Sequence, residues 1–257
     1  MAASDVLDAY LAEVDASVRF FRNAAQLRPR LGAFLVWGGA TADERKLFNS
    51  FLGGGPNESR IYGAAVVATC AGLEQFTTEL VDEFCEAVNA RELDAGAIES
   101  LLPGILNNQR KYAGYPLEKV HEPRGYWGIA YDKLVASLAS TAQGSGRVVL
   151  YGRAFSVNAG GIDGGSFDRA FARTSFKFPW ADICRSRSLQ KELGTAALAE
   201  TERELKSLFE DMGRLRNSLA HSQGSEYVSY EKLIRIVAVS RLFAKEASRC
   251  VLGSIGQ

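Results

Sequence analysis

The sequence has few of the residues on which metal and disulfide chemistry depend. It contains two histidines, His121 and His221, and four widely separated cysteines with no Cys-x-x-Cys pair. Neither a zinc site nor a disulfide framework is expected from this pattern. A His-Glu-x-x-His motif, a Gly-x-Ser-x-Gly motif and a Gly-Lys-Ser/Thr phosphate loop are also absent. These absences argue against a metal-dependent nuclease, and no cofactor is expected.

The chain also lacks an excess of either charge, because 30 Lys and Arg balance 30 Asp and Glu. A neutral protein does not coat nucleic acid through its overall charge, although a local basic pocket remains compatible with this balance. No apolar run approaches the ~18 residues of a membrane span. The acidic start, MAASDVLDAYLAEVD, lacks the regions of a signal peptide. Together these features predict a reducing, cytoplasmic setting.

Four segments carry apolar residues at the three- and four-residue steps of amphipathic helices. They cover about 5–36, 60–90, 194–222 and 229–254, and Ser229 is placed to cap the last of them. The segment 60–90 also contains small residues, among them Gly63 and Gly72, that would let another helix approach closely. The pattern predicts a mainly α-helical fold in which residues 1–257 form a single helical-bundle domain.

Residues 91–190 have a weaker periodicity. Two short helices are expected between 102 and 140, a short strand in RVVLY at 147–151, and a further short helix that begins at Ser166 after a glycine-rich turn. This stretch predicts an irregular α/β insertion between core helices rather than a second domain.

The second histidine stands at the end of the segment 194–222, in the sequence Arg-Asn-Ser-Leu-Ala-His of residues 216–221. On a helix, Asn217 and His221 are four residues apart and share a face, while Arg216 lies about 100° round from Asn217. Near a helix C-terminus, the helix dipole also favours a protonated imidazole. The spacing therefore predicts that Arg216 and Asn217 flank a groove that His221 reaches from the last turn.

This arrangement resembles the R-x4-H signature of the HEPN-superfamily ribonucleases. As in that family, a polar residue follows the arginine, the motif lies at the end of a long helix, and one more helix follows. The upstream sequence ATCAGLEQFTTELV (68–81) resembles a HEPN core helix, including Glu74. The layout is similar to the RiboL-PSP-type and MAE-type HEPN groups of prokaryotic defence and toxin–antitoxin loci. The resemblance covers about 60–90 and 195–252.

The resemblance implies a HEPN-like helical bundle that forms a homodimer, with the two motifs meeting at the interface. It implies a metal-independent endoribonuclease, a toxin or defence effector, with an antitoxin or defence-system protein as a partner. Arg216 and His221 would be catalytic, and Asn217 and Glu74 would support them. The chemistry is coherent, because an imidazole of pKa near ~6.5 exchanges protons at neutral pH. A guanidinium binds phosphate, and RNA supplies its own 2′-hydroxyl nucleophile.

Other interpretations of the same residues stay open. A non-catalytic HEPN-like module would only dimerise or bind a partner. In a third interpretation, Tyr227, six residues after His221, is modified by a neighbouring nucleotidyltransferase that controls a toxin. Glu74 fits either an acid that orients Arg216 or an ion pair at a buried helix junction. His121 is expected to be a loop residue.

Overall fold

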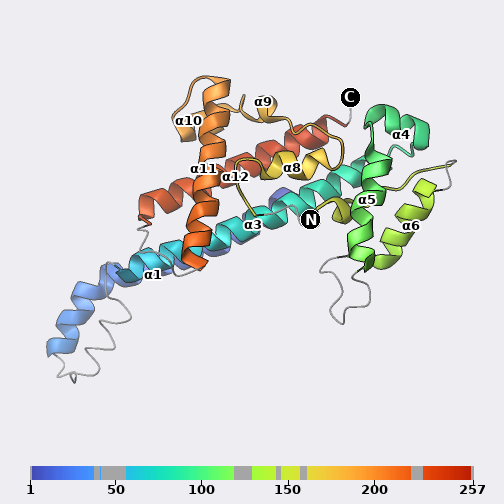
Figure 1. Cartoon of the computed structure of the whole chain (residues 1–257). Helices are drawn as coiled ribbons and strands as arrows, with labels where there is room; N and C mark the ends of the chain where they lie inside the picture. Colours follow the sequence, from blue (N-terminus) through green and yellow to red (C-terminus); the bar gives the residue numbers. More distant parts are fainter. Residues whose placement is uncertain are drawn as a thin grey trace.

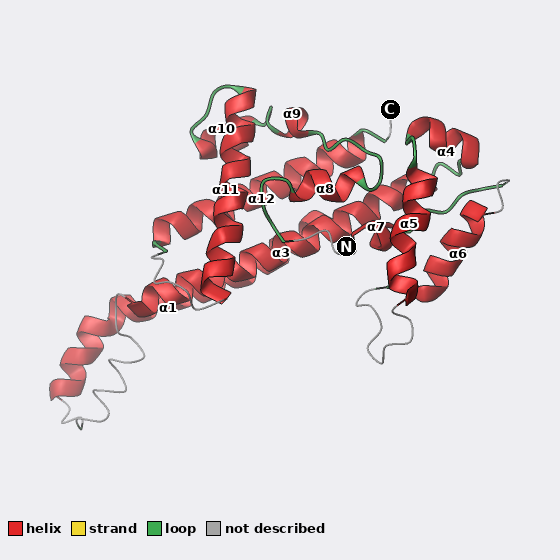
Figure 2. Ribbon diagram, in the orientation of Figure 1, coloured by secondary structure: helices red, strands yellow, loops and turns green. Residues whose placement is uncertain are grey.

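The computed structural model describes residues 2–37, 41, 56–118, 129–142, 146–156, 161–220 and 228–255. These residues form helices and no β-strand, which confirms the predicted mainly α-helical fold (Figures 1 and 2). The helices are α1 (Ala3–Trp37), α3 (Pro56–Asn89), α4 (Ala95–Leu101), α5 (Ile105–Glu118), α6 (Tyr131–Ala142), α7 (Gly152–Ser156), α8 (Ser166–Ala172), α9 (Trp180–Ile183), α10 (Arg187–Leu193), α11 (Leu198–Ala220) and α12 (Tyr230–Gly253). None of them is long and apolar enough to cross a bilayer.

Three long helices, α1, α3 and α12, pack against one another and form the body of the bundle (Figure 1). Helices α3 and α12 run in the same direction. The Tyr62 and Tyr230 rings lie 5.9 Å apart at one end, and Arg91 donates a hydrogen bond to the Ile255 carbonyl at the other (3.1 Å). Helix α1 runs along α3 in the opposite direction (Figure 1). The four segments with the strongest helical periodicity thus correspond to α1, α3, α11 and α12.

Helix α11 crosses α3, and small residues of α3 allow its neighbours to come close. A Cβ atom added at Gly63 would lie 3.0 Å from the Leu219 side chain of α11. One added at Gly72 would lie 3.0 Å from the Leu7 side chain of α1. The predicted role of these small residues in helix approach is confirmed. The same crossing brings Glu74, two residues after Gly72, against α11.

A cluster of aromatic rings joins α8 to the long helices. The Phe167 ring centroid lies 6.4 Å from that of Phe76 in α3, 5.6 Å from Phe209 in α11 and 4.7 Å from Phe243 in α12. Such pairs add about 0.5–1.5 kcal/mol each beyond the burial of their area. The helix predicted to begin at Ser166 is therefore part of the main core. Its position fixes the preceding loop, 161–165, against α11.

The strand predicted at 147–151 is not found. Its one β-like contact is an isolated bridge between Asp94 and Arg147. Successive N–H groups of this extended stretch donate instead to side chains, Val149 to Ser140, Leu150 to Asn89 and Tyr151 to Gln109. Because these side chains satisfy the backbone, the stretch needs no partner strand. The described part of the insertion is helical rather than α/β, and α5 and α6 are the two short helices expected there.

Two helix boundaries have clear physical causes. Helix α11 begins at Leu198, later than predicted, because Gly194 ends α10 with a φ of 74°. That left-handed conformation favours glycine and terminates helices. The Ser229 hydroxyl accepts a hydrogen bond from the Lys232 N–H at 3.2 Å, which confirms Ser229 as the N-cap of α12.

Candidate functional site

Arg216 of α11 forms an ion pair with Glu74 of α3. Arg216 Nη1 lies 3.0 Å from Glu74 Oε1, and Nη2 donates a hydrogen bond to Oε2 at 3.4 Å. The two side chains are 35% and 28% exposed, so the pair lies at the edge of the core and not within it. Arg216 Nε makes no hydrogen bond with any residue that the structure describes. Among the described residues, the guanidinium is therefore paired through its terminal nitrogens alone.

Cys70 lies one turn before Glu74 on α3 and carries a thiol, which is a potential nucleophile. Its thiol is fully buried and directed at the Met212 carbonyl at 3.7 Å. Burial raises the pKa of Cys70 to about 12, against the smaller lowering effect of the Arg216 charge. Cys70 is thus a neutral packing residue.

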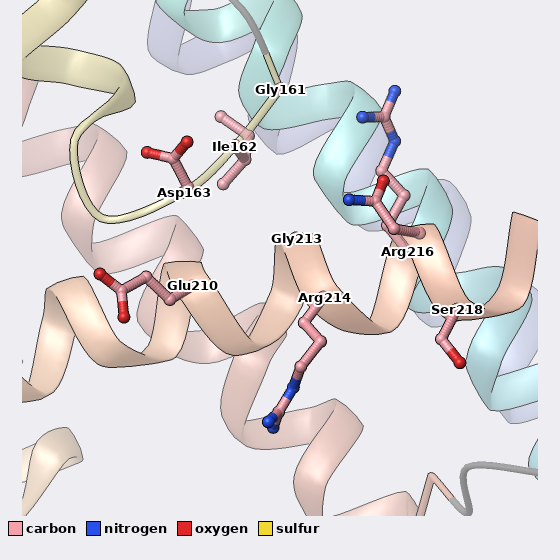
Figure 3. A pocket seen from close by; sticks show the side chains of 9 residues that line it. Gly161, Ile162, Asp163, Glu210, Gly213, Arg214, Arg216 and Ser218 are labelled. Atoms are coloured by element: carbon pink, nitrogen blue, oxygen red, sulfur yellow. The ribbon is translucent and has the colours of Figure 1, made fainter. Parts of the chain in front are cut away.

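A cleft of about 690 Å³ opens beside Arg216, between α11 and the loop 161–165 (Figure 3). Its lining residues are Gly161, Ile162, Asp163, Glu210, Gly213, Arg214, Arg216, Asn217 and Ser218. Positions 210, 213, 214 and 217 recur at the spacing that places side chains along one helix face. The predicted supporting residue Asn217 therefore shares a cleft with Arg216.

Glycines allow the loop and α11 to touch. A Cβ atom added at Gly213 would lie 2.3 Å from the Ile162 carbonyl oxygen, closer than any real contact. One added at Gly161 would lie 2.9 Å from Arg216 Nη1 and 3.4 Å from Glu74 Oε1. The backbone of the loop thus covers one side of the ion pair, and the absence of a side chain at position 161 leaves the guanidinium in place.

The charges around the cleft are largely balanced. Both carboxylate oxygens of Asp163 accept hydrogen bonds, Oδ2 from Arg169 at 2.6 Å and Oδ1 from the Gly165 N–H at 2.7 Å. Burial alone would raise the pKa of Asp163, but these donors outweigh it and lower the pKa. Arg214 pairs with Asp211 at 2.9 Å and projects away from the loop (Figure 3). Arg216 is therefore the cation that faces the loop side of the cleft.

The remaining candidates lie outside the described residues. Helix α11 ends at Ala220, directly before His221, so the place of His221 relative to Arg216 stays a prediction. His121 and Tyr227 also fall in segments that the structure does not describe. Among the described residues, no three His, Cys, Asp or Glu side chains gather as metal ligands.

Comparison with protein-family models, curated proteins and solved structures gives no match to this chain. A function must therefore be inferred from its residues and their geometry. The sequence reasoning missed Glu210 and Gly213, although their spacing to Asn217 marks them as neighbours on α11. No spacing rule reveals the contacts of Gly161 and Ile162, because these depend on how the loop crosses the helix.

Proposed function

We propose that the protein is a metal-independent endoribonuclease in which Arg216 binds the scissile phosphate and His221 transfers protons. The observation that supports this most is the state of Arg216. Glu74 contacts its terminal nitrogens, its Nε has no described partner, and it borders a cleft five residues before His221 in the sequence. A guanidinium that is oriented but incompletely paired suits the binding of a phosphate, which accepts two parallel N–H donors.

The reaction is an attack of the RNA 2′-hydroxyl on the adjacent phosphorus. A base removes the 2′-hydroxyl proton, the 2′-oxygen forms a bond to phosphorus, and the bond from phosphorus to the 5′-oxygen breaks. An acid returns a proton to that leaving oxygen. The products carry a 2′,3′-cyclic phosphate and a 5′-hydroxyl. The nucleophile belongs to the substrate, so the protein needs to supply only proton transfer and charge stabilisation.

Glu74 acts in this proposal as a positioning residue. Its Oε1 lies 3.0 Å from Arg216 Nη1 and its Oε2 accepts a hydrogen bond from Nη2 at 3.4 Å, and these contacts orient the guanidinium. Because the Gly161 backbone lies on the adjoining side, the Nε edge remains for the phosphate. Asn217, which lines the same cleft, can donate an amide hydrogen bond to the nucleotide.

We also propose that the active form is a homodimer acting as a toxin or defence effector, controlled by an antitoxin or another defence protein. One chain supplies a single histidine to the motif, whereas the reaction needs a base and an acid at once. Two copies that meet at their motifs would provide both. Light scattering is expected to give a dimer, and a fully active monomer at micromolar concentration would contradict this.

A non-catalytic, partner-binding module is the second candidate, and the ion pair itself favours it. The pair joins α3 to α11, so Glu74 and Arg216 are also explained by a purely structural role. Incubation of the purified protein with single-stranded RNA in EDTA separates the two. Cleavage to cyclic-phosphate ends supports the nuclease. Cleavage that is lost in EDTA and restored by magnesium, or none at all, contradicts it.

A further inference from the structure

The loop 161–165 touches both ends of the cleft through two glycines. A Cβ atom at Gly161 would lie 2.9 Å from Arg216 Nη1, and one at Gly164 would lie 2.7 Å from Glu210 Oε1. Figure 3 shows Glu210 and Arg216 at the two ends of the stretch of α11 that borders the loop, with Gly213 between them. The cleft therefore has a cationic end and an anionic end, each positioned against the backbone of one loop.

Glu210 has no role inside the described fold. Its carboxylate accepts no hydrogen bond and forms no ion pair within the part of the chain that the structure describes, and its side chain is exposed. Asp163, the other acid that lines the cleft, differs because Arg169 and the Gly165 N–H occupy its two oxygens. Glu210 is thus the cleft carboxylate with unused acceptors.

Arg216 and Glu210 line the same cleft, so one bound ligand can contact both of them. No aromatic side chain is among the described residues that line the cleft. Among these residues, hydrogen-bonding side chains rather than aromatic rings can distinguish the bases.

We propose that Glu210 recognises the base of the bound RNA and that the cleft prefers guanosine, with phosphate at Arg216 and guanine at Glu210. This inference rests on the proposed function. A carboxylate only accepts hydrogen bonds, and guanine alone presents two adjacent donors, N1–H and N2–H, on its Watson–Crick edge. Adenine and cytosine place a ring acceptor beside their amino group, and uracil flanks N3–H with two carbonyls. Each of these repels one carboxylate oxygen.

Four chimeric oligonucleotides test the proposal. Each has one ribonucleotide, G, A, C or U, in an otherwise 2′-O-methyl chain, so that one phosphodiester bond can be cleaved. The wild type is expected to cleave the G substrate about tenfold faster or more, which is the discrimination of a good bidentate contact. Glu210→Gln is expected to lose that advantage, because the amide offers one acceptor and an opposing donor. Glu200→Gln, an acid of the same helix outside the cleft, is the matched control and should keep it.

The outcomes separate this inference from the proposed function. Equal cleavage of the four substrates, or a guanine preference that survives Glu210→Gln, overturns base recognition and leaves the nuclease intact. If the wild type cleaves none of them, unmodified single-stranded RNA in EDTA still decides the proposed function, and fully 2′-O-methylated versions decide the inference by fluorescence anisotropy. Tighter binding of the G oligonucleotide that depends on Glu210 then supports recognition. Binding that is equal for the four bases, or undetectable, overturns it.

Discussion

Arg216 and Glu74 meet at 3.0 Å although 142 residues separate them in the chain. Because both side chains are about one-third exposed, solvent screens the pair, and we expect a coupling of about 0.5–1 kcal/mol. Urea unfolding of Arg216→Ala, Glu74→Gln and the double variant measures this coupling. Additive effects of the two single substitutions would mean that the ion pair does not couple α3 to α11.

The contact of Gly213 with the Ile162 carbonyl gives a second prediction. Alanine is favoured over glycine in a helix by about 1 kcal/mol. Gly213→Ala is nevertheless expected to destabilise the protein by about 1–2 kcal/mol, because its Cβ would lie 2.3 Å from that oxygen and the loop must shift. Gly114→Ala in α5 is the matched control, since a Cβ there meets nothing within 4 Å, and it should stabilise. Equal stabilisation by both substitutions would refute the loop–helix contact.

Gly161→Ala is expected to displace the Arg216 guanidinium while leaving the stability of the fold almost unchanged. Its Cβ would lie 2.9 Å from the end of the flexible Arg216 side chain, which can move aside at small cost to stability. Cleavage is expected to fall about tenfold or more, since a displaced charge donor loses much of its effect on the transition state. The melting temperature should change little. A normal cleavage rate in this variant would show that the observed pose of Arg216 is irrelevant to activity.

The packing of α11 on α3 predicts slow thiol chemistry. Burial raises the pKa of Cys70 from 9.0 to about 12, so its thiolate fraction at pH 8 falls about a thousandfold. In the native protein, iodoacetamide is expected to modify Cys250 first, since that residue is 9% exposed and Cys70 is fully buried. Unfolding in guanidinium should make the four cysteines equally reactive. Rapid native modification of Cys70 would contradict the helix crossing beside the ion pair.

The sequence alone predicts the long helices well and the loop contacts poorly, for physical reasons. Apolar residues at helical spacing, such as Leu205, Phe209 and Met212 of α11, are local signals, and these residues are fully buried as expected. The extended stretch 147–151 contains Val148 and Val149, whose β-branched side chains favour strands. Its amides are satisfied by side chains of α3, α5 and α6, and this depends on tertiary packing.

For the candidate site too, local spacing predicts some residues, whereas others depend on tertiary packing. The motif spacing predicts that Arg216 and Asn217 border a groove, and both line the cleft. Glu74 fits two roles, an acid that orients Arg216 or one half of an ion pair at a helix junction. Both roles require contact between Glu74 and Arg216, and the structure shows this contact. The sequence does not predict that the Gly161 backbone lies against the Arg216 guanidinium, because a glycine-rich loop can cross a helix in many registers.

The most direct measurement is the rate of RNA cleavage in EDTA by the wild type, His221→Ala, Arg216→Ala and Arg216→Lys, alongside their melting temperatures. Loss of a general acid–base costs about 10²–10⁴-fold, and loss of a positioned charge donor costs a similar factor. We expect both alanine variants to lose cleavage. Lysine should restore little, because a point charge does not reproduce the planar fork of arginine. The melting temperature of His221→Ala should match that of the wild type. Cleavage by His221→Ala at the wild-type rate would contradict the proposed nuclease.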